Sequence, residues 1–232
     1  MSTEIKPIKM WGKAGPNPSK VHIILLELGI PHELIDVPFS DVKSPEYVKV
    51  NPNGRLPTIH DPNTNITLWE SGAIIEYLIE RYDTKHTLSF LAGTLEYYHA
   101  KQWLFYQVTG QGPYFGQAVW FKIYHHEQLE SAKERYNQEV NRVTGVLDSY
   151  LAQQKEKYSG VEGFDGPWLV GNKASYADIA FVTYQTILAF LLGKDAFDMD
   201  KYPHAQDWLA RVSARPAVKE GLAAMIAEAG KK

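Results

Sequence analysis

Hydrophobic and polar residues alternate with two different periods along the first 85 residues. Ile8 and Met10 alternate with lysines, which is typical of a short strand. Apolar residues then recur at helical spacing over residues 21–28, and Gly29 fits the position just after a helix. This part of the chain is therefore predicted to form a strand followed by a helix that ends near Gly29.

Three further strands and a second helix follow. Alternation with branched residues predicts a strand over residues 33–37, and two more strands are expected over residues 56–60 and 66–69. The segment "DPNTN" between the last two is typical of a turn. Ser71 then begins a helix with apolar residues on one face. The predicted order is β-α-β, a loop region, and β-β-α.

From about residue 96 the pattern is helical throughout. One apolar stripe at helical spacing runs from Tyr136 to Tyr150, and the glycine-rich segment 159–167 ends that helix. The segment "ASYADIAFVTYQTILAFLL" is apolar nearly all round, which predicts a buried central helix. Ser175 and Asp178 resemble a capping box at its start. Two shorter amphipathic stretches follow Pro203 and Pro216.

These patterns predict an α/β domain joined to an all-helical one. The boundaries that we expect are residues 1–85 for the first domain, 86–95 for a linker and 96–232 for the second. No internal repeat or low-complexity tract interrupts this division.

Composition narrows the classes of function. The formal charge of -3 and the pI of about 6.2 give no basic footprint for nucleic acid. The chain has no cysteine, so it has neither disulfides nor a cysteine nucleophile of its own. The start of the chain shows no signal-peptide pattern, and no uncharged run is long enough to span a bilayer. We therefore expect a cytoplasmic protein without a membrane partner.

The segment "LWESGAII" combines two chemical groups at the start of a helix. If Ser71 is the N-cap, the free N–H groups of the first turn and the helix dipole suit a small carboxylate. Glu70 beside it suits an ammonium group. An α-amino-acid group carries both charges on one carbon, so the pair fits such a ligand. The alternative is an ordinary helix cap with an acidic neighbour.

Pro57 lies where a strand is expected, although proline removes a donor from a sheet. A cis bond between Leu56 and Pro57 would turn the chain, and the Leu56 backbone could then pair with a peptide-like ligand. A trans proline on an edge strand is the alternative.

The segments "NPNGRLPTI", "LWESGAIIEYL" and "GNKASYADI" together resemble the cytosolic glutathione transferases over essentially the whole chain. More narrowly, "GPNPSKV" and "GQGPYFGQAVWF" resemble the fungal nitrogen-regulator-like transferases, and the bacterial nu class shares much of this pattern. The resemblance implies a thioredoxin-like N-terminal domain, an all-α C-terminal domain and a homodimer.

The resemblance also assigns a set of residues to glutathione: Lys43, Arg55, Leu56, Pro57, Glu70 and Ser71. Glu70 and Ser71 would hold the γ-glutamyl end, and the Leu56 backbone would pair with the cysteinyl part. Lys43 lies where the family often has a cation for the glycine carboxylate, although a solvated lysine is the alternative. Related sequences often have a histidine just before that cation, and this chain has Val42.

By resemblance the residue that stabilises the glutathione thiolate is Asn17. Its amide can donate a hydrogen bond but cannot remove a proton, and a turn asparagine is the alternative. A free thiol has a pKa of about 8.5. Lowering this pKa by ~1.5–2 units requires that the site favour the thiolate over the thiol by roughly 2–3 kcal/mol. One hydrogen bond to the thiolate (roughly 1.5–3 kcal/mol) at a helix start can supply this. Ser19 is the second candidate donor, although we favour a helix N-cap for it.

For a second substrate we expect a cleft between the domains that is lined by Tyr114, Phe115 and Trp120, with core packing as the alternative use of these rings. The neighbouring Gly110, Gly112 and Pro113 favour a kink in a helix over a nucleotide-binding loop. We expect no metal site, because His125 and His126 occupy adjacent positions that point in different directions.

Two classes of function remain. The first is a glutathione transferase in detoxification, whose bound thiolate attacks a small electrophile or reduces a disulfide or a peroxide. Glutathione would be its co-substrate, without a prosthetic group. The second is a regulator or ligand-holding module that binds glutathione without turnover.

Overall fold

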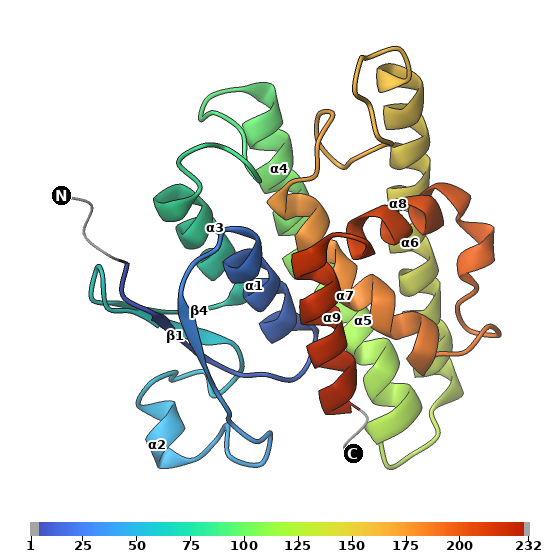
Figure 1. Ribbon diagram of the computed structural model, residues 1–232. Helices are drawn as coiled ribbons and strands as arrows, with labels where there is room; N and C mark the ends of the chain where they lie inside the picture. Colours follow the sequence, from blue (N-terminus) through green and yellow to red (C-terminus); the bar gives the residue numbers. More distant parts are fainter. Residues whose placement is uncertain (1–4, 230–232) are drawn as a thin grey trace. The chain divides into compact units, whose positions relative to one another are not determined.

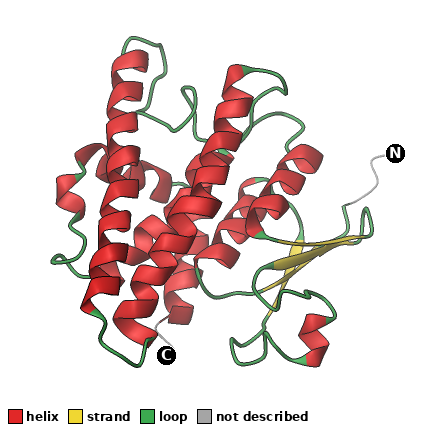
Figure 2. Ribbon diagram, turned by 180° about the vertical axis from the view of Figure 1, so that it is seen from behind, coloured by secondary structure: helices red, strands yellow, loops and turns green. Residues whose placement is uncertain are grey.

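The computed structural model describes residues 5–229 (Figure 1). The described residues form two compact units, one of residues 5–87 and 216–229 and the other of residues 88–215. The first unit has the thioredoxin-like arrangement and the second is helical, as the sequence predicts (Figure 2).

Four short strands form the sheet of the first unit in the order β2-β1-β3-β4. Their bounds are Ile8–Trp11 (β1), His32–Ile35 (β2), Thr58–Asp61 (β3) and Ile66–Trp69 (β4). β2 is parallel to β1, whereas β3 is antiparallel to both β1 and β4. The third strand begins at Thr58 and not at residue 56 as predicted, because Pro57 has no N–H for the ladder. The second strand ends at Ile35, two residues earlier than predicted.

Helices complete this unit. Their bounds are Pro16–Glu27 (α1), Pro45–Val48 (α2), Ser71–Tyr82 (α3) and Pro216–Ala229 (α9). α1 ends as predicted, since Gly29 follows it with a φ of 62° and its N–H bonds to the Leu26 carbonyl. α1 packs against both α3 and α9 (Figure 1). A Cβ atom built on Gly221 of α9 would lie 2.4 Å from the Ile23 side chain.

The second unit is built from helices of three kinds. Their bounds are Leu95–Tyr106 (α4), Gln107–Gln111 (η1), Gly112–Val119 (α5), Trp120–Tyr124 (η2), Glu130–Tyr158 (α6), Tyr176–Leu191 (α7), Met199–Lys201 (η3) and Pro203–Ser213 (α8). The predicted interruption near Gly110 and Gly112 is the π-helical segment η1 between α4 and α5. The Gln111 amide holds this segment by donating to the Phe181 carbonyl of α7 at 3.2 Å.

α7 is the buried central helix that the sequence predicts, and its capping box is confirmed. The Asp178 carboxylate accepts the Ser175 backbone N–H and hydroxyl, each at 2.9 Å. It also accepts the Leu169 N–H at 3.0 Å and the Trp208 indole N–H at 2.8 Å. One buried carboxylate thus joins the start of α7 to a loop and to α8. Within residues 5–229, no helix is long and apolar enough to cross a membrane.

Candidate functional site

Strand register brings three separate segments together at one edge of the sheet. Thr58 of β3 lies opposite Trp11 of β1 on one side and Trp69 of β4 on the other. The residues just after β1, just before β3 and just after β4 therefore meet at this edge. These segments include Leu56–Pro57 and Glu70–Ser71, the two pairs of residues that the sequence predicts to bind a ligand.

The Leu56–Pro57 peptide bond is cis, which decides between the two predicted alternatives. Leu56 is half-buried beside the start of α1. A Cβ atom built on Gly12 would lie 3.2 Å from the Leu56 Cβ and 3.3 Å from the ring of Pro18. Within the described part of the chain, no hydrogen bond engages the backbone N–H or C=O of Leu56. Both groups are therefore available to a ligand.

Asparagine side chains hold the loop that precedes Pro57. The Asn51 amide donates to the Arg55 carbonyl at 2.6 Å, and its oxygen accepts the Asn53 N–H at 2.9 Å. The Tyr47 hydroxyl also donates to the Arg55 carbonyl, at 2.8 Å. The Arg55 backbone is thus fixed while its side chain is exposed. The predicted ligand contact of Arg55 remains untested, but the side chain is accessible.

Lys43 lies against the same loop. Its ammonium donates to the Asn53 carbonyl at 2.8 Å, and its stem packs on Gly54. Gly54 has a φ of 57°, and a Cβ there would lie 2.6 Å from the Val42 carbonyl oxygen. The close approach therefore requires glycine. The lysine has a defined protein partner, in contrast to a freely solvated side chain.

α3 begins at Ser71 as the sequence predicts, but the N-cap residue differs from the prediction. Glu70, and not Ser71, is the N-cap residue, and it has a left-handed φ of 75°. Ser71 is the first helical residue, and among the residues that the structure describes no side chain caps the first turn. Its backbone N–H groups therefore face the site without a protein acceptor. The Asn53 amide donates to the Glu70 carboxylate at 3.4 Å, which links Lys43, Asn53 and Glu70 in one chain of contacts.

Asn17 and Ser19 both lie in the first turns of α1. Asn17 is half-buried, one residue after the helix begins. The predicted N-cap role of Ser19 is wrong, because the N-cap is Gly15 and Ser19 lies inside the helix. The buried Ser19 hydroxyl donates to the Gly15 carbonyl at 2.9 Å. Its proton is therefore engaged within the helix, which argues against Ser19 as the donor to a ligand sulfur.

Sequence reasoning missed Lys20 and Asn53. Lys20 is 1% exposed, and burial lowers the pKa of its ammonium to about 7 although the Glu70 carboxylate acts in the opposite direction. Its position one turn before Ile24, on the apolar face of α1, is the signal that could have revealed it. Asn53 lies in "NPNG", a composition typical of turns, which gives no signal of its contact with Glu70.

The structure does not bring the three predicted aromatic residues onto one surface. Phe115 is fully buried and packs against Tyr184 at a ring distance of 6.3 Å, which favours core packing for it. Tyr114 is half-buried beside Tyr136, whereas Trp120 is 48% exposed. Only Tyr114 and Trp120 keep an accessible ring surface.

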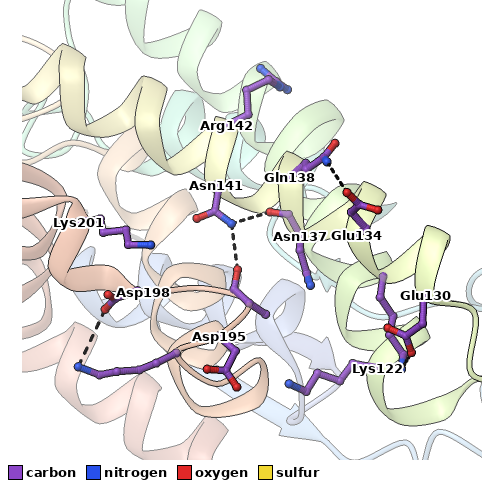
Figure 3. Close-up of a pocket in the computed structure, with 13 residues that line it drawn as sticks. Lys122, Glu130, Glu134, Asn137, Gln138, Asn141, Arg142, Asp195, Asp198 and Lys201 are labelled. Atoms are coloured by element: carbon purple, nitrogen blue, oxygen red, sulfur yellow. Dashed lines mark hydrogen bonds and ion pairs between the residues drawn. The ribbon is translucent and has the colours of Figure 1, made fainter.

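A polar pocket of about 880 Å³ lies within the second unit (Figure 3). Most of its lining is charged, with both signs present: Lys122, Glu130, Lys133, Glu134, Asn137, Gln138, Asn141, Arg142, Lys194, Asp195, Ala196, Asp198 and Lys201. Several of these side chains pair with one another, as Lys133 does with Glu130 at 2.7 Å. None of the predicted site residues lines it. In the described residues, no group of three or more His, Cys, Asp and Glu side chains is placed to hold a metal.

Comparison with known proteins assigns this fold to a class. Residues 14–81 match the family described as "Glutathione S-transferase, N-terminal domain", and residues 115–224 match "Glutathione S-transferase, C-terminal domain". The chain therefore belongs to the glutathione transferase family.

Individual relatives narrow this class. The chain is 55% identical over 225 residues to the glutathione S-transferase-like protein gedE of Aspergillus terreus. This match covers 97% of this chain and 98% of that protein. Among solved structures, it is similar to the glutathione transferase URE2P6 from Phanerochaete chrysosporium in complex with oxidized glutathione. That structure has a TM-score of 0.83 and 42% identity, with 93% of this chain and 94% of that chain covered.

A third similar structure is Ure2p in complex with glutathione. Its TM-score is 0.86 at 32% identity, and the match covers 95% of this chain and all (100%) of that one. Within the family, the chain therefore groups with the Ure2p-like fungal transferases.

Proposed function

We propose that this chain is a glutathione transferase that binds glutathione at the edge of the sheet where Leu56, Glu70 and Ser71 meet. The observation that carries the proposal is the register of Trp11, Thr58 and Trp69, which gathers the free Leu56 backbone and the uncapped start of α3 at one place. Relatives of similar fold hold glutathione, its S-hexyl derivative and its oxidised form, which supports the same ligand here.

Each part of the tripeptide has a matching group. The γ-glutamyl ammonium pairs with Glu70, and its carboxylate accepts from the Ser71 end of α3. The cysteinyl backbone pairs with Leu56 as an added strand would. Lys43 and the exposed Arg55 side chain supply positive charge for the glycine end.

The sulfur then lies at the start of α1, where Asn17 donates to the thiolate. Asn17 stabilises the anion and does not take the proton, because a carboxamide is not a base. The thiolate attacks a small electrophile and forms a carbon–sulfur bond as the leaving group departs with the electron pair. Tyr114 and Trp120 are the aromatic residues that we propose for the second substrate.

Disulfide reduction is a second candidate activity. The bound thiolate attacks a disulfide, forms a mixed disulfide and releases one half of the substrate as a thiolate. A second glutathione thiolate then attacks the mixed disulfide, which releases the other half as a thiolate and forms oxidised glutathione. Because the chain has no cysteine, glutathione supplies both electrons. Support comes from relatives solved with oxidised glutathione and with two glutathione molecules per subunit. A peroxide would be reduced by the same two thiols.

We also propose a homodimer. Exposed apolar side chains follow one face of α4 and the segment before it: Leu91, Leu95, Tyr98 and Phe105. Each is more than half exposed. Within α4, the helical spacing of Leu95, Tyr98 and Phe105 places these three on one face. A second copy of the chain would remove this stripe from water.

A panel of three assays tests the function. Purified protein is supplied with glutathione and, in turn, an aryl halide, a peroxide and hydroxyethyl disulfide. We expect saturable glutathione binding and a rate above background with at least one of them, and a loss of binding in Glu70→Gln. Saturable binding without turnover of any of the three would support the alternative, a non-enzymatic glutathione-binding module.

A further inference from the structure

The polar pocket of the second unit takes no part in the proposed glutathione chemistry (Figure 3). α6 forms one wall of this pocket, and residues that follow α7 form another. The Asn141 amide of α6 joins the two walls, since it donates to the Ala196 carbonyl at 3.0 Å and its oxygen accepts the Tyr202 hydroxyl at 2.9 Å. The Lys122 ammonium of η2 donates to the Leu192 carbonyl. These contacts fix the walls before a ligand arrives, which lowers the entropic cost of binding.

Many of the charged side chains that line the pocket already have a partner. Three of the cations form ion pairs: Lys133 with Glu130 at 2.7 Å, Lys194 with Asp198 at 4.0 Å and Asp200 at 2.7 Å, and Arg142 with Glu139 at 2.8 Å. The Glu134 carboxylate accepts from the Gln138 amide at 3.3 Å. These groups contribute to the walls and leave little charge for a ligand.

Four side chains of the lining have no side-chain partner among the described residues: Lys122, Asn137, Asp195 and Lys201. The partner of Lys122 is a neutral backbone carbonyl, so its positive charge is not compensated. Asp195 and Lys201 are exposed, whereas Asn137 is half-buried. The Asn137 carboxamide can both donate and accept. The pocket therefore presents free groups of both charges together with an amide.

The charge and the size of the pocket define the class of ligand. The lining has five cationic and four anionic side chains, so a ligand with one net negative charge would balance it. An apolar ligand would remove water from these charges and give them no hydrogen bonds in return. The volume of about 880 Å³ lies within the range of roughly 300–1,000 Å³ that is typical of small-molecule sites. The pocket therefore suits a small ligand that carries charges of both signs.

We propose that this pocket binds an acidic α-amino acid, either free or as the glutamyl part of a small peptide. Such a ligand has two carboxylates and one ammonium. The ammonium pairs with Asp195, and the carboxylates accept from the ammonium groups of Lys201 and Lys122. Asn137 supplies a further hydrogen bond from the side of α6. All of these residues belong to the second unit, so the proposal is independent of the glutathione site in the first.

An NMR titration of the isotope-labelled protein with L-glutamate and, separately, with glutathione tests the proposal. The salt concentration is about 0.1 M, at which exposed charges more than roughly 10 Å apart are screened. We expect saturable chemical-shift changes at the backbone amides of Asp195 and Ala196 and at the side-chain amide of Asn137. Residues at the start of α3 report separately on the proposed glutathione site. The lower of the two dissociation constants at the pocket distinguishes a free amino acid from a peptide as the ligand.

Lys201→Glu should weaken L-glutamate binding at the pocket about tenfold, because the reversed charge turns an attraction into a repulsion. Lys155→Glu is the matched control, since it makes the same charge change at an exposed position of α6 outside the pocket. It should retain the wild-type affinity. Circular dichroism checks the folding of each variant.

Asp195→Asn tests the pairing with the ligand ammonium. Glutarate has the same two carboxylates as L-glutamate but no ammonium. The variant should therefore weaken the binding of L-glutamate and leave that of glutarate unchanged or tighter.

Three results would overturn the inference. The first is an absence of saturable shifts at the pocket with both probes, and shifts confined to the start of α3 count as this result while they support the glutathione site. The second is an equal loss of affinity in Lys201→Glu and Lys155→Glu. The third is an equal effect of Asp195→Asn on L-glutamate and glutarate, which would show that the pocket does not recognise the ammonium.

Discussion

Single polar side chains shape the site at the edge of the sheet. The Asn51 carboxamide donates and accepts at once, so that one side chain fixes two parts of the same loop. The Asn53 carboxamide donates to the Glu70 carboxylate. Ser19 shows the opposite case, because its hydroxyl is engaged by the Gly15 carbonyl. The residues that remain available to a ligand are those whose hydrogen bonds the fold leaves incomplete, with Leu56 as the clearest example.

Asn17→Ala should raise the pKa of bound glutathione by about one unit, because the variant removes a hydrogen bond of roughly 1.5 kcal/mol to the thiolate. The pKa is measured from the ultraviolet absorbance of the thiolate in a titration of the complex. Ser19→Ala is the control and should leave it unchanged. If Ser19→Ala raises the pKa while Asn17→Ala does not, the donor has been assigned to the wrong residue.

At the scale of elements, the ends of strands and helices decide what the site presents. Glu70 takes a left-handed conformation between β4 and α3, and this turn leaves the first N–H groups of α3 uncapped. Gly54 takes the same conformation in the loop before β3, where it lies against the carbonyl of Val42 and the stem of Lys43. The functional segments are thus the irregular connections, while the regular elements hold them in place.

Gly54→Ala should weaken binding of S-hexylglutathione by at least about tenfold, because a Cβ would push the Lys43 segment and the loop apart and misplace the site. Calorimetry measures the effect. Gly29→Ala is a matched control, since Gly29 has a similar φ of 62° with no atom within 4 Å of the added Cβ. Its conformational cost is about 1–2 kcal/mol, but ligand affinity should be retained. Equal loss of affinity in both variants would show that the close approach at Gly54 is unimportant.

Asp178→Ala should lower the free energy of unfolding by more than about 3 kcal/mol, because it leaves the buried Leu169 N–H and Trp208 indole N–H without an acceptor. Urea denaturation monitored by tryptophan fluorescence measures the change. Asp207→Ala is the control, since the Asp207 side chain is 61% exposed in its pair with Arg211, and should cost no more than about 0.5 kcal/mol. Similar midpoints for the two variants would contradict a central role for the capping box.

At the scale of the whole molecule, the residues proposed for function are divided between the two compact units. The first unit carries the residues that we propose for glutathione, together with the C-terminal helix α9. The second carries the aromatic residues and the apolar stripe on α4. Association of two copies through that stripe would bury large side chains that are costly to leave in water.

Leu95→Glu combined with Phe105→Glu should convert the protein from a dimer to a monomer, because the two charges would have to be buried in the interface. Sedimentation equilibrium should give about twice 26.3 kDa for the wild type and 26.3 kDa for the variant. Ile226→Glu, at another exposed apolar position on α9, is expected to remain dimeric. A wild type that is monomeric at every concentration would refute the dimer.

The sequence by itself determined most of the elements and the candidate segments. The strand at residues 66–69, the buried helix α7 and its Ser175–Asp178 capping box depend on neighbours within a few positions, and such local patterns can be read directly. Family resemblance assigned Glu70 and Leu56 to the glutathione site for the same reason, since each lies in a short and specific motif.

Only the tertiary structure decided how these segments meet. The row of Trp11, Thr58 and Trp69 depends on strand register, and the burial of Lys20 depends on how α1 packs against α3 and α9. The paired residues Trp11 and Thr58 are 47 positions apart along the chain (58 − 11), and no local period encodes such a pairing. Hydrogen bonds and charge interactions act over a few ångströms in space, so their partners are settled only when the chain has folded.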